Sequence, residues 1–396
     1  MVAPLMRLGP HSLGFTLLIG ALAGLPVLST DMGLPGLPLL ELGRGAGGLA
    51  ATTAQAALTL SVFMAGFGGA QVILGPLSDR IGRRPVLLGG LALYTLAGLV
   101  CALAPSVGFL LAARLAQGAG AAVGTVLSFA ILRDLFDGPA ARARLSTVSM
   151  VYSVAPIIAP TLGGLMLRLG GWRDIFGLLA LTGLLLLGAA ALGLPETRRQ
   201  LPVVHYAAVL RQGRTVGYGL VGAMSIGNVF AFVAGSPLVL LGLRHMSVPA
   251  FGGVFAIITS GVVAGAAVNR RLIARGIGAD LPLGGGLLLA ALAGLTAAGL
   301  AATGLLELPA LVVLMFASTF ARGLVGPNIT HAALERVPQM AGAASALIGS
   351  LQMLTGALSG LVVGVMVTRL GGLGMAATMA GFAVPAMAAW LVVRRW

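Results

Sequence analysis

The sequence predicts an all-α membrane protein with about twelve transmembrane helices, and three observations lead to this fold class. The 396 residues are 58% hydrophobic and only 9% charged, with a mean hydropathy of +1.04, a composition that excludes a soluble globular chain. Long apolar runs, near the roughly 20 residues that a helix needs to cross about 30 Å of hydrocarbon, are joined by short turns that contain arginine. The longest polar break, residues 195–214, separates six runs from six more.

The apolar runs give the expected helices in chain order. They lie near 13–39, 50–74, 86–104, 107–132, 146–168, 173–194, 215–241, 248–269, 281–304, 309–332, 341–366 and 373–393. The first run is too long for a signal peptide and spans follow it without pause, so we expect it to be the first helix. The polar break predicts an N-terminal six-helix bundle over 1–194, a cytoplasmic linker over 195–214 and a C-terminal six-helix bundle over 215–396.

A weak internal repeat relates these two halves. Arg114-x-x-x-Gly118 in the fourth run recurs as Arg322-x-x-x-Gly326 in the tenth. Arg270 and its neighbours follow the eighth run, where a degenerate copy of the turn between the second and third runs is expected. Parallel repeats of this kind predict two pseudo-symmetric bundles.

The arginines set the expected orientation, because all 24 basic residues are arginine. With the N-terminus inside, the cytoplasmic set is Arg7, Arg80, Arg83, Arg84, Arg133, Arg142, Arg144, Arg198, Arg199, Arg211, Arg214, Arg270, Arg271, Arg275, Arg336, Arg394 and Arg395. The opposite face receives only Arg44, Arg168, Arg173, Arg244 and Arg369. The positive-inside rule therefore predicts that both termini are cytoplasmic. Since the arginines are dispersed between apolar spans, the net charge of +14 does not indicate nucleic-acid binding.

The stretch from Gly75 to Pro85 packs four charges into eleven residues between two uncharged runs. We expect it to be a tight turn on the cytoplasmic side, since glycine and proline suit a turn and its three arginines mark the inner face. Its charged members are Asp79, Arg80, Arg83 and Arg84, with Gly82 among them. One interpretation is that these arginines only fix the topology.

Asp31 is the one acidic residue that lies within an apolar run and away from a loop. A charge inside the bilayer costs on the order of 2.5–3.5 kcal/mol on insertion scales, so its presence there indicates a role. Burial favours the neutral form of a carboxyl group, and such an acid can bind and release a proton near neutral pH. The glycines and prolines between Gly33 and Pro38 are expected to distort this helix. The alternative is a helix-end residue wetted by the periplasmic interface.

Arg114 is the buried cation expected nearest to Asp31. It lies about seven residues into its run, hence about 10 Å below the outer face at 1.5 Å per residue. Asp31 is expected at a similar depth, so the two side chains are predicted to face each other across a cavity. Gln117 lies one turn further on the same side. The alternative is an arginine that satisfies backbone carbonyls.

Other spans carry isolated polar, aromatic or thioether side chains, each of which has either a structural role or a role in substrate binding. Arg322 lies near the middle of its run with no acid in that run before Glu335, so a bond to a carbonyl is as well supported as a substrate role. The seventh and eleventh runs add polar, aromatic and thioether groups, for which packing is the alternative to ligand contact: Asn228, Phe232, Gln352 and Met353.

The fifth run carries prolines four residues apart and a glycine pair just beyond: Pro156, Pro160, Gly163 and Gly164. Proline kinks a helix and releases carbonyls, while glycine permits close helix contact. We therefore expect a bend where this span faces the other half.

Several of these motifs resemble a known family. G-x-L-S-D-R-x-G-R-R-P, at 75–85, resembles the signature turn between helices 2 and 3 of the major facilitator superfamily. S-T-D-M-x-L-P-x-L-P, R-x-x-Q-G, A-P-x-x-A-P-x-x-G-G, G-W-R-D-I-F and L-P-E-T are similar to motifs of its Bcr/CflA-type drug:proton antiporters. The match runs over nearly the whole chain and is densest in 25–200. One departure is Gly33, where the family often has tyrosine, so the substrate size is expected to differ.

The resemblance implies the major facilitator fold and assigns roles. Asp31 would carry the proton and Arg114 would be its charge partner. The turn, with Gly75, Asp79, Arg80, Gly82, Arg83 and Arg84, would latch the two halves on the cytoplasmic side, and the stretch from Pro156 to Gly164 would be the antiporter motif. A substrate cavity is expected to include Gln117, Asn228, Phe232, Arg322, Gln352 and Met353.

We compare three classes of function for this sequence. A proton-coupled exporter of amphipathic drugs fits best. A symporter or facilitator for a small metabolite on the same fold would need more hydrogen-bonding groups in the spans than this chain has. A membrane enzyme would need clustered catalytic groups, which the sequence does not supply. Cys101 is the only cysteine, so we expect no disulfide within the chain and no Cys-based metal site. We also expect no other metal site and no cofactor. The expected partners are a drug-like small molecule, protons and the lipid bilayer, for a monomer in the bacterial inner membrane.

Overall fold

The computed structural model describes residues 8–43, 45, 47–136, 138–197 and 206–396, and all regular secondary structure in these ranges is helical. The elements are α1 (Leu13–Asp31), η1 (Leu34–Glu41), α2 (Thr53–Ile81), α3 (Arg83–Ala102), α4 (Val107–Leu135), α5 (Gly138–Leu169), α6 (Trp172–Gly193), α7 (Tyr206–Leu210), α8 (Gly213–Pro237), η3 (Leu238–Leu243), α9 (Val248–Ala274), α10 (Asp280–Ala302), α11 (Leu308–Leu334), η4 (Pro338–Met340), α12 (Ala341–Leu370) and α13 (Gly372–Val393).

Eleven helical stretches among the described residues are long and apolar enough to cross a membrane. Two of them combine a helix with its irregular continuation, α1 with the 3-10 helix η1 and α8 with the π-helix η3. The fifth expected span corresponds to α5, which includes the apolar stretch Val154–Leu169. The chain is thus a multi-pass helical membrane protein.

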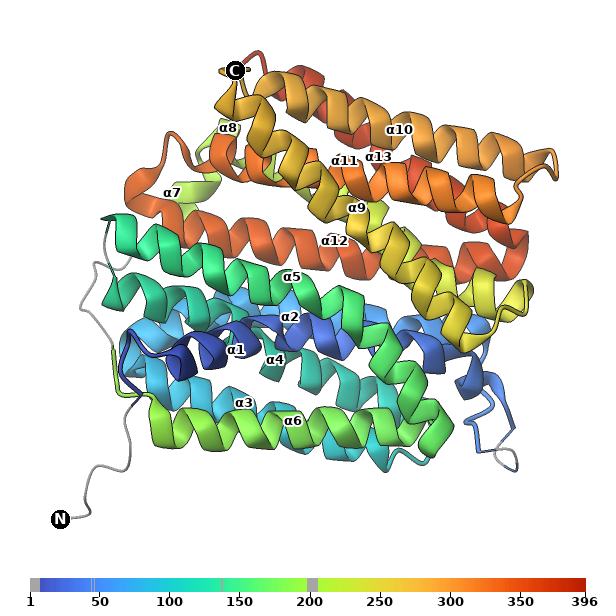
Figure 1. Cartoon of the computed structure of the whole chain (residues 1–396), viewed down its shortest axis with the longest axis horizontal. Coiled ribbons are helices and arrows are strands. Elements are labelled where there is room, and N and C mark those ends of the chain that lie inside the picture. The colour runs from blue at the N-terminus through green and yellow to red at the C-terminus, as the bar shows by residue number, and fades with distance from the viewer. Residues whose placement is uncertain (1–7, 44, 46, 137, 198–205) are drawn as a thin grey trace.

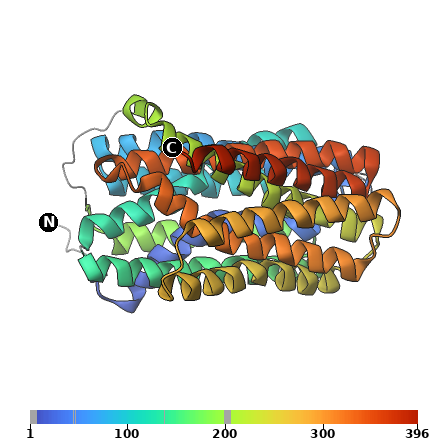
Figure 2. The same cartoon turned by 90° about the horizontal axis from the view of Figure 1, so that it is seen from above.

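The helices form two packed groups, which Figure 1 shows as a blue-to-green layer and a yellow-to-red layer. Within the first group α1 packs on α4 and α5, and α3 on α4 and α6; within the second α8 packs on α12 and α13, and α9 on α11. The groups meet along α2 and α12, and where α5 contacts α9. In the turned view the long helices again run side by side along the long axis (Figure 2).

Glycine allows the helix axes of the first group to approach closely. A Cβ atom at Gly118 of α4 would overlap the backbone carbonyl of Phe63 in α2, and one at Gly124 would overlap that of Leu22 in α1. Small residues at such crossings let backbones pack in lipid, where apolar burial between helices contributes little. This packing fixes the position of the α4 side chains between α1 and α2.

The predicted turn at 75–85 is wrong in its extent. Helix α2 continues through Pro76 to Ile81 and α3 begins at Arg83, so Gly82 alone joins them. Gly82 has φ of 112°, a conformation that L side chains rarely adopt, and it therefore ends α2 abruptly. Most of the charged motif is consequently helical.

Two further expectations concern helix ends and can be compared with the structure. The distortion expected after Asp31 is confirmed: α1 ends there and the chain continues as a 3-10 helix that contains Pro35 and Pro38. The short helix α7 lies within the expected linker at 195–214 and was not anticipated. Several residues used for the predicted orientation lie outside the described part of the chain: Arg7, Arg44, Arg198, Arg199 and the side chain of Arg142.

Candidate functional site

Asp31 lies at the last position of α1, where the helix changes to η1. Its side chain is buried, with 6% of the residue exposed. The Thr30 hydroxyl lies 2.9 Å from Asp31 Oδ1 and also 2.9 Å from the Val27 carbonyl. The carboxyl group therefore sits at a break in the helix with one hydroxyl as its hydrogen-bond partner.

Arg114 connects three helices. Its Nε donates to the Thr59 carbonyl of α2 at 3.2 Å, its Nη2 to the Ser29 carbonyl of α1 at 3.3 Å, and its Nη1 to Gln117 Oε1 at 2.8 Å. The guanidinium also lies 4.3 Å from the Phe63 ring centroid. Only 3% of Arg114 is exposed, so this cation is held by carbonyl dipoles and an aromatic face.

Asp31 and Arg114 are brought to the same region, since Arg114 bonds to a carbonyl two residues before Asp31. Within the described part of the chain, the ion pairs found do not include these two side chains. In this structure Arg114 thus binds backbone carbonyls, which is the alternative interpretation of this residue. Its role as charge partner of Asp31 stays a prediction.

A buried polar network continues behind Arg114. Gln117 is fully buried, and its Oε1 accepts from Arg114 and lies 3.8 Å from the Cys101 thiol. The Ser29 hydroxyl, whose own carbonyl binds Arg114, lies 2.6 Å from the Tyr94 hydroxyl. This network joins α1, α3 and α4 and holds the guanidinium in a fixed direction.

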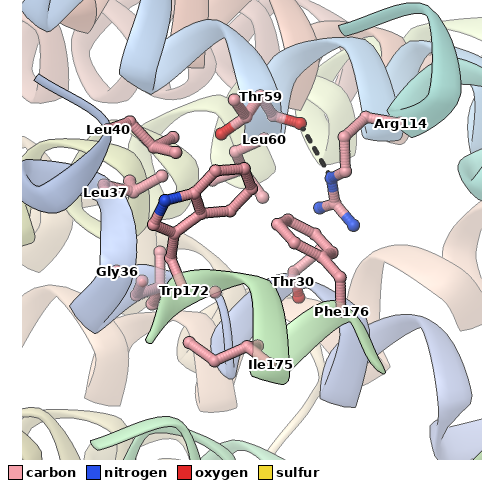
Figure 3. A pocket seen from close by; sticks show the side chains of 12 residues that line it. Thr30, Gly36, Leu37, Leu40, Thr59, Leu60, Arg114, Trp172, Ile175 and Phe176 are labelled. Carbon is pink, nitrogen blue, oxygen red and sulfur yellow. Dashed lines mark hydrogen bonds between the residues drawn. The ribbon is translucent and has the colours of Figure 1, made fainter. Parts of the chain in front are cut away.

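A small pocket opens beside this network. Its lining comes from α1, η1, α2, α4 and α6: Thr30, Gly33, Leu34, Gly36, Leu37, Leu40, Thr59, Leu60, Arg114, Trp172, Ile175 and Phe176. Figure 3 shows the Arg114 guanidinium and Thr30 on one side of it and Leu37 and Leu40 on the other. The pocket is therefore apolar with one polar end.

Helix α6 forms part of the pocket wall, and Trp172 is its first residue. The Trp172 Nε1 donates to the Gly47 carbonyl at 2.9 Å, which ties α6 to the loop after η1. Arg173 lies over the Trp172 ring at 4.3 Å from its centroid and donates to the Ala104 carbonyl. These contacts explain the G-W-R-D-I-F stretch as an anchor for the pocket wall.

The candidates from the second group of helices do not line this pocket. Asn228 is engaged in packing: its Nδ2 donates to the Met379 carbonyl at 3.1 Å, and its Oδ1 accepts from Ser318 at 2.6 Å. Phe232 stacks on Phe255 with centroids 5.5 Å apart. These two contacts correspond to the packing alternative stated above.

The remaining cavity candidates lie elsewhere in the second group of helices. Met353 of α12 lies against Gly68 of α2, and Gln352 lies against Gly222 of α8. Arg322 is half-buried in α11 with its guanidinium beside Gly326. A substrate cavity shared by these residues stays a prediction.

The charged motif at the α2–α3 junction is held within the first group of helices. Arg83 is 4% exposed and pairs with Asp79 at 2.5 Å and with Asp134 of α4 at 2.9 Å. Glu196 accepts from the Arg83 and Arg84 backbone N–H groups at 2.8 and 3.1 Å, where a carboxylate suits the N-terminus of α3. The described bonds of Arg83 and Arg84 thus stay among α2, α3, α4 and the end of α6.

A link from this junction toward the second group comes from α7. The Tyr206 hydroxyl donates to the Val72 carbonyl of α2 at 2.7 Å, while Val209 packs with Val337 and Ala344. Burial and the nearby Asp79 carboxylate raise the pKa of Tyr206 above its ordinary value, so the hydroxyl stays a donor. Sequence reasoning gave α7 no role.

Helix α5 runs through both prolines without a break, and the predicted bend stays a prediction. Gly163 lies against the Met32 carbonyl of the α1–η1 junction, and Gly164 faces Val248 of α9. The fifth span therefore contacts both Asp31's neighbourhood and the other group of helices, as its glycine pair suggested.

Several residues at the site were not singled out from the sequence. Ser29 and Thr30 directly precede Asp31, and hydroxyl groups beside a buried acid are a usable signal. Thr59, Tyr94 and Phe176 reach Arg114 or its partners only through helix packing, so spacing along one helix does not reveal them.

Comparisons with known proteins agree with this architecture. A family model described as Major Facilitator Superfamily matches residues 11–360. The chain is 32% identical over 362 residues to a bicyclomycin resistance protein homolog of Haemophilus influenzae, covering 88% of each chain. It is 34% identical to a chloramphenicol resistance protein of Pseudomonas aeruginosa over 71% of this chain and 67% of that one.

Solved structures show the same fold. A bacterial homolog of the human lysosomal transporter Spinster, in an inward-facing conformation, superposes with a TM-score of 0.76 and 17% identity over 98% of each chain. A D-xylose–proton symporter gives a TM-score of 0.72 with 17% identity, over 96% of this chain and 98% of that one. At this identity the likeness concerns the fold alone.

Proposed function

Because the chain belongs to the major facilitator superfamily, and is therefore a transporter and not an enzyme, we propose that it exports amphipathic drug-like molecules in exchange for protons. Resistance proteins are among its relatives at 32% and 34% identity. Among the described residues, the observation that carries proton exchange is the buried Asp31 carboxyl group at the break between α1 and η1. An acid inside a membrane span is costly and marks a proton or ion path in transporters.

The same proposal includes the full topology. Twelve spans form two pseudo-symmetric six-helix bundles, over 1–194 and 215–396, joined by a cytoplasmic linker over 195–214. Both termini lie in the cytoplasm of a bacterium, and the protein acts as a monomer in the inner membrane. The two packed groups of helices and the contacts of α2 with α12 support this division.

Exchange then follows from alternating access. The substrate cavity lies between the two bundles and opens to one side of the membrane at a time. The motif at 75–85 stabilises the closed cytoplasmic side. The small glycines of α5 allow this helix to slide along α9. Binding of drug at the cavity and of a proton at Asp31 compete, so each cycle moves them in opposite directions.

A symporter or facilitator for a hydrophilic metabolite is the alternative on this fold. A hydrophilic substrate needs many hydrogen-bond donors and acceptors in the cavity, and Asn228, Ser318 and Thr319 of α8 and α11 are already bonded to each other or to backbone. Export of amphipathic molecules therefore accounts better for this chain.

The energy source provides a direct test. The sequence lacks lysine, so it contains no phosphate-binding G-x-x-x-x-G-K-[S/T] loop for ATP. In an efflux-deficient bacterial host expressing this protein, efflux of a fluorescent amphipathic drug is expected to stop when an ionophore collapses the proton gradient. Cells expressing Asp31→Asn serve as the matched control for background efflux. Efflux that persists without the gradient at unchanged ATP would contradict the proposal.

A further inference from the structure

We propose that a water molecule occupies the polar end of the pocket in Figure 3, and that the Thr30 hydroxyl passes the coupling proton between that water and Asp31. This inference rests on the proposed proton exchange and extends it by naming the route and the residue that positions the proton. Thr30 is a positioning residue here, since the carboxyl group that holds the proton is Asp31.

The hydrogen bonds of Thr30 suit both protonation states of its neighbour. Thr30 Oγ1 lies 2.9 Å from Asp31 Oδ1 and 2.9 Å from the Val27 carbonyl, yet a hydroxyl group has a single hydrogen to donate. When Asp31 is ionised, Thr30 donates to the carboxylate. When Asp31 is protonated, its O–H donates to Thr30, which then donates to Val27. Each state leaves every hydrogen with an acceptor.

The pocket offers this hydroxyl a place to meet water. Thr30 lines the pocket together with Thr59 and Arg114, so its polar end combines a hydroxyl, a backbone carbonyl region and a guanidinium. A buried water needs about two to four polar partners and room for one molecule, and Thr30, Thr59 and Arg114 are the polar residues that line the pocket. The other lining side chains are apolar, which confines water to the polar end.

The proposed route lies within the first group of helices. The lining residues come from α1, η1, α2, α4 and α6 alone, all in the first group. The two groups of helices touch each other where η1 contacts η3 and where α5 contacts α9. The proposed route therefore runs through elements of the first group.

Other ionisable groups near the route are accounted for. Arg114 is the one charged residue in the described lining, and its guanidinium is directed to carbonyls and Gln117. Tyr94 and Cys101 meet the network through Ser29 and Gln117 and do not line the pocket. Thr30 is consequently the hydroxyl through which the pocket and the acid are connected.

The transfer conserves atoms and charge. A hydronium ion at the polar end gives one proton to Thr30 Oγ1 and becomes water, while Thr30 gives its own hydroxyl proton to Asp31 Oδ1. Thr30 ends as a neutral hydroxyl and Asp31 as a neutral acid, so a single positive charge has moved from water to the carboxylate. Release of the proton is the reverse of these two transfers.

The test compares Thr30→Val, which keeps the shape and removes the hydroxyl, with Thr30→Ser, which restores it. Purified full-length protein is mixed rapidly with a pH-indicator dye at lower pH, and the uptake abolished by Asp31→Asn is taken as that of the acid. Because a positioned proton-transfer group contributes about 10²–10⁴-fold in rate, we expect Thr30→Val to slow this uptake at least about tenfold with unchanged final amplitude. Thr30→Ser should restore the parent rate within about threefold.

Uptake by Thr30→Val at the parent rate would overturn the inference, and lowered thermal stability with that unchanged rate would assign Thr30 a structural role only. If Asp31→Asn takes up as many protons as the parent, the proposed function itself fails, which this comparison reveals separately.

A second pair of variants tests the route if Thr30→Val does not fold. A Cβ at Gly36 would meet Ile175 Cδ1 and Trp172 Cβ at 3.4 Å, an ordinary contact, so Gly36→Ala narrows the pocket without a clash. Gly69→Ala is the matched control, because nothing lies within 4 Å of a Cβ there. We expect Gly36→Ala, and not Gly69→Ala, to slow proton uptake. Equal rates in the parent and both variants would overturn the route through the pocket.

Discussion

At the scale of single residues, Arg114 is defined by the shape of its side chain as much as by its charge. Its planar group donates to carbonyls of α1 and α2 and to Gln117 at once, a fork that a lysine ammonium on a flexible stem does not reproduce. Hydrogen bonds to charged groups contribute about 1.5–3 kcal/mol each. Arg114 therefore sets the relative position of the helix that carries Asp31.

Replacement of this residue gives the first prediction. Arg114→Lys should lower drug efflux at least about tenfold although the charge is kept, since one lost charged hydrogen bond of about 1.5–3 kcal/mol corresponds to that factor or more. Arg275→Lys is the matched control, because Arg275 is an exposed arginine at the end of α9. Initial efflux rates at equal protein level provide the measurement. Parent-like efflux by Arg114→Lys would show that charge alone suffices.

The sequence identified Asp31 and Arg114 because a charge within an apolar run is visible without a structure. It did not identify Tyr94, Thr59 or Phe63, which reach the site from neighbouring helices. Helix crossings such as Gly118 against Phe63 determine these contacts, and a single sequence does not show which helix faces which. The sequence also allows Arg114 to bind backbone carbonyls, and the bond to the Ser29 carbonyl is one such contact.

At the scale of elements, the α2–α3 junction is a helix–glycine–helix connection held by charges. Arg83 lies between Asp79, whose side chain is 40% exposed, and Asp134, whose side chain is 3% exposed. An exposed partner contributes about 0–1 kcal/mol, whereas removing one member of a buried pair costs about 3–5 kcal/mol. The two acids thus have different consequences when changed.

This difference gives a second prediction. Asp79→Ala should leave the protein folded, with a loss of at most about 1 kcal/mol, because Asp134 still holds Arg83. Arg83→Ala should destabilise it by about 3–5 kcal/mol, since Asp134 is left buried without its cation. Thermal unfolding in detergent measures both. If Asp79→Ala is as unstable as Arg83→Ala, the exposed acid is a structural element of the junction.

Asp79→Ala also tests the proposed latch. A latch at this junction predicts that the variant favours the inward-open state, which cysteines placed in the cytoplasmic half of the seam would report as faster labelling. Unchanged labelling with normal efflux would leave the motif only its role in topology.

Element boundaries were predictable where one residue type decides them. The break after Asp31 followed from the prolines of η1, whereas the extent of the α2–α3 turn did not follow from its glycines and prolines. Pro76 lies inside α2, and the positive φ of Gly82 alone makes the turn. Charge density suggested a loop at 75–85, but ion pairs and the carboxylate of Glu196 allow these charges to lie on helices.

At the scale of the whole molecule, proton and drug paths are expected to occupy different places. Asp31, Arg114 and the pocket lie within the first group of helices, while the contacts of α2 with α12 and of α5 with α9 form the seam that must open for a drug. Exchange therefore requires that binding at the seam changes the proton affinity of a site inside one group. The α1–η1 break, which contacts α5 through Gly163, is suited to transmit this change.

Proton release on drug binding tests this coupling most directly. Purified protein in weakly buffered detergent solution, at a pH where Asp31 holds its proton, is mixed with a transported drug while a pH indicator is followed. The account predicts that the parent releases protons when the drug binds, and that Asp31→Asn binds a neutral drug without releasing any. Proton release by Asp31→Asn equal to that of the parent would contradict the assignment of Asp31 as the coupling site.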